Sequence, residues 1–179
     1  MTTIFCSKKL EGFLNNSDPY LEPDYGNKFG NWNAHTFLIE RKRFILFTND
    51  RTTYSIVFID IRKADLKDFD HLFRESLIRQ LDNDVRINER QEIELRNSLT
   101  DIRLTRTNNN KRVLGTMNEF VHIIKYFVAN EGGPAHISAM ELGYRINNQL
   151  VKAPLEVTSE KYSVPKELML QLLQKNTSL

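Results

Sequence analysis

The chain has 179 residues, of which 40% are hydrophobic and 27% charged, so it can bury the core of one globular domain. Its 25 basic and 23 acidic residues give a net charge of +2, which argues against a nucleic-acid-binding surface spread over the whole molecule but allows a local basic patch. The single cysteine, Cys6, excludes an internal disulfide and any multi-cysteine zinc or iron–sulfur site.

The first third of the chain predicts a strand, a long loop and a three-stranded meander. Residues 2–7 predict the first strand, and residues 15–33 are rich in the turn-forming types Asn, Asp, Pro and Gly. Three further runs of β-branched and aromatic residues predict successive antiparallel strands at residues 36–39, 43–47 and 53–59.

Apolar side chains at spacings of three and four predict amphipathic helices in the rest of the chain. The helices are expected from Asp65 to Leu81, over residues 88–99 and 112–130, and from Pro165 onward. Residues 101–105 predict a half-exposed strand, and residues 144–152 a small hairpin.

These elements predict an α+β fold with a central antiparallel sheet of four or five strands and amphipathic helices mainly on one face. Residues 1–155 are expected to form a single domain, and residues 156–179 an irregular segment with a C-terminal amphipathic helix. The N-terminal residues lack the order of a signal peptide, and no apolar run approaches the ~20 residues that span a bilayer. We therefore expect a cytoplasmic protein without a membrane segment.

The first candidate site lies at one end of the predicted hairpin. Trp32 and His35 enter its first strand, and Asn49, Asp50 and Arg51 form the turn after its second strand. His35 and Asp50 are candidate catalytic groups for proton transfer, while Trp32, Asn49 and Arg51 are candidate ligand-binding residues. The alternative is structural, with an aromatic residue at the core edge and turn side chains bonded to their own backbone.

The second candidate site is the start of the helix predicted at residues 112–130. Arg106, Lys111 and Arg112 precede or open this helix, and Asn118 follows one and a half turns later. A helix N-terminus beside cations can hold phosphate or nucleic acid. Gly115 would allow a ligand or a strand to approach closely. The alternative is a solvated helix cap.

Several other chemistries lack their signatures. The four histidines include no pair at the spacing of a zinc helix, so no metal site is expected. The chain has no phosphate-binding Walker loop and no nucleophile elbow. No cofactor is expected.

Three groups of residues resemble a bacterial domain family of unknown function, DUF6933. They are Trp32-Asn33-Ala34-His35, Leu46-Phe47-Thr48-Asn49-Asp50, and Val113-Leu114-Gly115-Thr116-Met117-Asn118-Glu119. The resemblance extends over residues 2–144. Where the family pattern has His and then Asn around the alanine, this chain has Asn33 and His35. The resemblance implies a domain and the positions of its motifs, and it supplies no reaction.

Three functions remain open from the sequence. The leading hypothesis is a binding module for an anionic ligand, nucleic acid or nucleotide, held by the basic helix start beside the hairpin. The second is an enzyme, a hydrolase or nuclease, that uses His35 and Asp50. The third is a structural or partner-binding protein that forms a homodimer or binds another protein through its C-terminal helix.

Overall fold

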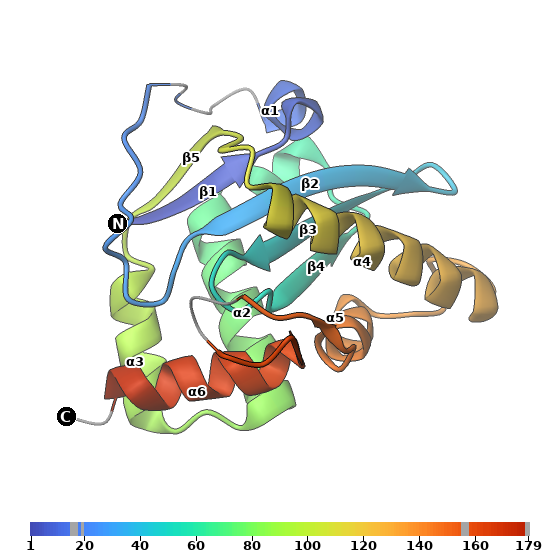
Figure 1. Ribbon diagram of the computed structural model, residues 1–179. Coiled ribbons are helices and arrows are strands. Elements are labelled where there is room, and N and C mark those ends of the chain that lie inside the picture. The colour runs from blue at the N-terminus through green and yellow to red at the C-terminus, as the bar shows by residue number, and fades with distance from the viewer. Residues whose placement is uncertain (15–17, 19, 155–157, 178–179) are drawn as a thin grey trace.

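A five-stranded sheet forms the centre of the molecule in the computed structural model, which describes residues 1–14, 18, 20–154 and 158–177 (Figure 1). Its strands lie in the order β4-β3-β2-β1-β5. The bounds are Thr2–Cys6 for β1, Trp32–Ile39 for β2, Lys42–Asn49 for β3, Ser55–Ile59 for β4 and Ile102–Arg106 for β5. The predicted meander is β2-β3-β4, and both of its pairings are antiparallel.

The sheet is mixed, whereas the sequence predicted an antiparallel one. β1 runs parallel to both of its neighbours, β2 and β5. Parallel neighbours need a long crossover connection, and residues 7–31 provide one between β1 and β2. This crossover contains α1, Lys8–Leu14, and most of the predicted loop.

Helices cover both faces of the sheet, which corrects the expectation of helices mainly on one face (Figure 1). The first core packs one face against α2, Phe69–Val85, α3, Glu89–Ser98, and α6, Pro165–Thr177. The second core packs the other face against α4, Lys111–Asn130, and α5, Ala139–Asn147. The fold is therefore α+β, as predicted, with helices on both sides of the sheet.

Two further predictions were wrong. The helix expected to begin at Asp65 begins at Phe69, because a short 3-10 turn, η1, Lys63–Leu66, precedes α2. Within that turn, Asp65 accepts from the Arg62 backbone N–H at 2.8 Å. The hairpin predicted at residues 144–152 does not form, because α5 continues to Asn147 and β6, Val151–Lys152, pairs with β7, Tyr162–Ser163.

The apolar stripe of α6 packs into the first core of its own chain. Met169, Leu172 and Leu173 are all buried there. The stripe that could have joined a partner is thus covered by this protein's own side chains. Within the described part of the chain, no helix combines the length and the apolar character needed to cross a membrane.

Candidate functional site

The start of α4 meets the end of the hairpin, a juxtaposition that the sequence left open. Arg112 lies in the first turn of α4, and its Nη2 donates a hydrogen bond of 2.6 Å to the backbone carbonyl of Asp50. Asn110 caps the helix, because its side-chain oxygen accepts from the Val113 backbone N–H at 3.3 Å. The two candidate sites are therefore neighbours in space.

Asn49 organises the turn between β3 and β4. Its side-chain oxygen accepts from the backbone N–H groups of Arg51 and Thr52 at 3.1 and 3.0 Å, and from the Thr52 hydroxyl at 3.0 Å. Its side-chain nitrogen donates to the Phe29 carbonyl at 2.9 Å. Asn49 is fully buried, so its polar groups hold the turn and have no path to a ligand.

Asp50 joins the same turn to the segment before β2. Its carboxylate accepts from the Asn31 backbone N–H at 2.9 Å, and its own N–H donates to the Asn31 carbonyl at 2.9 Å. Burial raises the pKa of Asp50, and the Asn31 hydrogen bond opposes this shift, as do the charges of Arg51 and Arg112. Gly30 has a φ of +79°, and a Cβ there would lie 2.6 Å from Oδ1 of Asp50, so only glycine fits.

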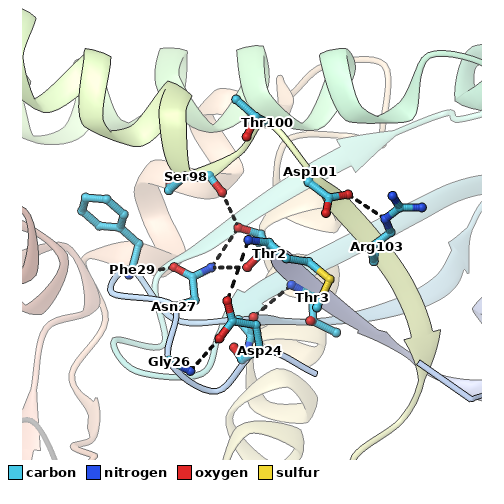
Figure 2. A network of polar contacts seen from close by, with 12 residues as sticks. Thr2, Thr3, Asp24, Gly26, Asn27, Phe29, Ser98, Thr100, Asp101 and Arg103 are labelled. Atoms are coloured by element: carbon cyan, nitrogen blue, oxygen red, sulfur yellow. Dashed lines mark hydrogen bonds and ion pairs between the residues drawn. The ribbon is translucent and has the colours of Figure 1, made fainter. Parts of the chain in front are cut away.

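A network of polar contacts fixes the loop that precedes Gly30 (Figure 2). Asn27 donates from its side-chain nitrogen to the Thr2 hydroxyl at 2.9 Å, and that hydroxyl donates to the Ser98 carbonyl at 2.8 Å. The Asn27 side-chain oxygen accepts from the Phe29 N–H at 3.0 Å. This described part of the predicted loop is thus tied to β1 and to the end of α3, and it holds the Asn49 and Asp50 turn in place.

His35 and Asp50 do not form an acid–base pair. Asp50 is bonded to Asn31, which precedes His35 by four residues, so about 13 Å of strand separates them at ~3.3 Å per residue. His35 is half-buried, stacks on Phe37 with ring centroids 6.3 Å apart, and has its pKa lowered by burial and by Lys9 and Lys125. Direct proton transfer between His35 and Asp50 is out of hydrogen-bond reach.

Trp32 lies on the face of the sheet opposite α4. It is 2% exposed and belongs to the first core, where its ring meets that of Phe73 edge-to-face at 5.3 Å. It therefore stabilises the core and is not available to a ligand beside Arg112.

A cavity of about 390 Å³ opens between α4 and the segment that begins with β6. We call it the α4–β6 cavity, and it is lined by Lys111, Arg112, Gly115, Thr116, Glu119, Lys152 and Ala153. No atom lies within 4 Å of a Cβ built on Gly115, so this glycine borders open space and does not pack against a strand. The cavity brings Lys111 and Lys152 together from two elements.

Sequence reasoning missed Lys152, because no local pattern places β6 beside α4.

Sequence reasoning also treated Asn33 only as part of a motif. Asn33 is 1% exposed, and neither its side-chain nitrogen nor its oxygen has a hydrogen-bond partner among the described residues. It lies in the row between Phe5 and Thr48, on the α4 side of the sheet.

The other predicted ligand-binding residues do not gather in the α4–β6 cavity. Arg51 donates from Nη1 to the Lys28 carbonyl at 3.3 Å. Arg106 lines a separate cavity of about 330 Å³ with Phe5 and the loop after α1, and Asn118 is exposed on α4 and lines neither cavity. In the described ranges, no three His, Cys, Asp or Glu side chains converge as metal ligands would.

The fold and the cavity describe a small α+β domain with a lysine-lined recess at the start of its longest helix. The family model of a domain of unknown function, DUF6933, matches residues 3–168. Because that span is most of the chain, the protein belongs to this family, and every residue that lines the α4–β6 cavity lies within the matched span. A search of curated proteins found no match to the chain.

Proposed function

We propose that this protein is a binding module for a small anionic ligand that bears phosphate, such as a nucleotide, and that the ligand occupies the α4–β6 cavity. The observation that supports the proposal is the meeting of Lys111 and Lys152 in one recess of about 390 Å³. Sites for small molecules commonly have volumes of roughly 300–1,000 Å³. Glu119 is the one acidic residue among the described lining residues.

The start of α4 adds to this charge. The N-terminal end of a helix carries a partial positive charge, which stabilises a nearby anion. Arg112 holds this end of α4 against the hairpin through the Asp50 carbonyl, so the helix start has a fixed position before a ligand arrives. Binding then loses little conformational entropy in the backbone of the site.

A small ligand fits the charge balance better than a nucleic acid polymer does. Proteins that bind the nucleic acid backbone use extended basic surfaces, whereas this chain has a net charge of only +2. Arg51 and Arg106, which would have enlarged a basic surface, lie outside the cavity. A location in the bacterial cytoplasm belongs to the same proposal.

Isothermal titration calorimetry with ATP, GTP and inorganic phosphate, at low and at physiological salt, tests this function. Binding of a phosphate compound that weakens with salt supports it. Absence of binding to all three at low salt overturns it. If single-stranded RNA binds more tightly than any nucleotide, the proposal of a small ligand is wrong and the ligand is a nucleic acid polymer.

Substitutions within the cavity sharpen the test. We expect Lys111→Glu and Lys152→Glu to abolish the binding, whereas Lys125→Glu should preserve it, because Lys125 is exposed on the same helix about 21 Å from Lys111. A Cβ at position 115 meets no atom within 4 Å, so the side chain of Gly115→Leu should extend into the cavity and block the ligand in a folded protein. Gly115→Ala is its matched control, since a single methyl group leaves most of the cavity open.

A further inference from the structure

The outer edge of β4 carries backbone groups that no neighbouring strand satisfies. In an antiparallel pair, alternate residues direct their N–H and C=O groups toward the partner strand and away from it. The Asn49 N–H donates to the Tyr54 carbonyl at 2.8 Å. In this register, the N–H and C=O groups of the even-numbered residues of β4, Ile56 and Phe58, point toward β3. Ser55, Val57 and Ile59 therefore direct their backbone groups outward.

Asn147 of α5 already satisfies the first of these residues. Its side-chain oxygen accepts from the Ser55 N–H at 2.8 Å, and its side-chain nitrogen donates to the Ser55 carbonyl at 2.9 Å. This amide pairs with Ser55 as a peptide group of an added strand would. Among the described residues, none takes the same role at Val57 or Ile59.

A groove of about 240 Å³ runs along this part of the edge, between α2 and α5. Ser76, Arg79 and Gln80 line it from α2, and Ala139 and Met140 line it from α5. The Gln80 side-chain nitrogen donates to the Met140 carbonyl at 3.1 Å and so bridges the two walls. The strand thus lies recessed between two helices. A recessed edge excludes another broad sheet, but it admits a single extended chain if that chain displaces the Gln80 side chain from the Met140 carbonyl.

We propose that this groove binds an extended peptide segment of a partner protein, which adds to the sheet as a sixth strand beside β4. The main chain of the peptide would pair with Val57 and Ile59, and this pairing would supply affinity without reading sequence. The proposal concerns a different surface from the α4–β6 cavity and does not depend on the function proposed for it.

The two walls of the groove specify the chemistry of the peptide. Side chains alternate between the two faces of a strand, so those of an added strand would point in turn toward α2 and toward α5. Of the described residues that line the groove, Arg79 alone is charged, and it lies on the α2 side. Met140 and Ala139 offer apolar contact on the α5 side. The occupant is therefore a segment in which acidic and apolar residues alternate.

Residue-resolved amide hydrogen exchange of the full chain tests the proposal, with a blocked peptide of alternating valine and glutamate as the probe. In the free protein, the amides of Val57 and Ile59 should exchange faster than those of Ile56 and Phe58, which are bonded to β3. The peptide should protect Val57 and Ile59. A peptide of the same sequence with alternate backbone nitrogens methylated should not, because it cannot donate to the edge.

Two variants connect the protection to the groove. Val57→Pro removes one outward N–H while leaving the β3 ladder intact, and should weaken peptide binding about tenfold. Because the ring could disturb the packing of Val57, Arg79→Glu provides a second variant at an exposed position, and it should weaken the acidic peptide but not a valine–lysine peptide. The matched control is Arg90→Glu, an exposed arginine on α3 that does not line the groove.

Three outcomes would overturn the proposal. The first is equal exchange of Val57 and Ile56 in the free protein, which would mean that the edge is already paired or the strand is open. The second is an absence of protection at saturating peptide. The third is protection of Val57 without peptide together with a doubled mass in light scattering, which would make a second copy of this chain the occupant.

Discussion

Replacement of Asn49 by alanine should strongly destabilise the protein. The buried Asn49 side chain makes four hydrogen bonds of 2.9 to 3.1 Å, to the backbone of Phe29, Arg51 and Thr52 and to the Thr52 hydroxyl. A typical intramolecular hydrogen bond contributes about 1 kcal/mol net, and a buried group left unpaired loses more. The Thr52 hydroxyl can rotate toward another acceptor, so we expect a loss of about 3–4 kcal/mol in the free energy of unfolding.

Urea denaturation of the purified variant, followed by circular dichroism, measures this loss as a lower midpoint with an unchanged slope. Asn118→Ala is the matched control, because Asn118 is exposed on α4 and should change stability by no more than about 0.5 kcal/mol. A loss below about 1 kcal/mol for Asn49→Ala would refute the assignment of the turn to structure. The Thr48-Asn49-Asp50 motif would then need a functional explanation.

Three further changes test other parts of the fold. Gly115→Ala should raise the free energy of unfolding by about 0.5–1 kcal/mol, because the new methyl group meets no atom and alanine favours the helix. Thermal or urea melts measure this gain, and a lower stability would mean that the space beside Gly115 is filled. Asn33→Leu should stabilise the protein by about 1–3 kcal/mol, since the buried amide has no described partner. A loss of stability in the same melts would reveal that a buried water or ligand bonds to the Asn33 amide. The His35 imidazole should titrate by NMR below its ordinary pKa, since burial lowers that pKa. The contribution of His35 to stability is therefore fully present above about 6.5, the ordinary value, and should be lost as the pH falls below that value through the lowered pKa of the folded state. This pH dependence should be absent in His35→Gln.

The elements that depend on local pattern were predictable from the sequence. The meander follows from runs of β-branched residues with short turns, and its register brings Asn33 opposite Thr48. The long helix follows from its apolar stripe and from the Asn110 cap, and its observed start at Lys111 is one residue from the predicted one. Local propensity and tertiary packing agree in both elements.

The features that depend on distant packing were not predictable in this way. The parallel placement of β1 depends on its crossover to β2, which has no sequence period of its own. The segment predicted as a hairpin continues as helix because Asn147 gains a buried role against Ser55, on a strand that lies 92 residues earlier in the chain. Lys152 reaches the cavity for a similar reason, since only the tertiary fold brings β6 beside α4.

The candidate site shows why polar crowding in a sequence is an ambiguous sign of function. Asn49 and Asp50 looked like ligand or catalytic groups, yet their side chains are bonded to backbone groups of the loop and turn around them. A turn that must hold two loops and a strand end together needs the same residue types as an active site. The distinguishing observation is burial with all hydrogen bonds satisfied, which a single sequence does not contain.

The two proposed surfaces can be tested separately, because none of the described residues that line the α4–β6 cavity also lines the groove beside β4. Gly115→Leu should therefore abolish nucleotide binding while the valine–glutamate peptide still protects Val57. Arg79→Glu should have the opposite pattern. The surfaces are nevertheless close along the chain, since α5 begins at the groove and leads directly to β6. If either variant altered both activities by the same factor, the two ligands would share one site or one unfolding event, and the assignment of separate surfaces would be wrong.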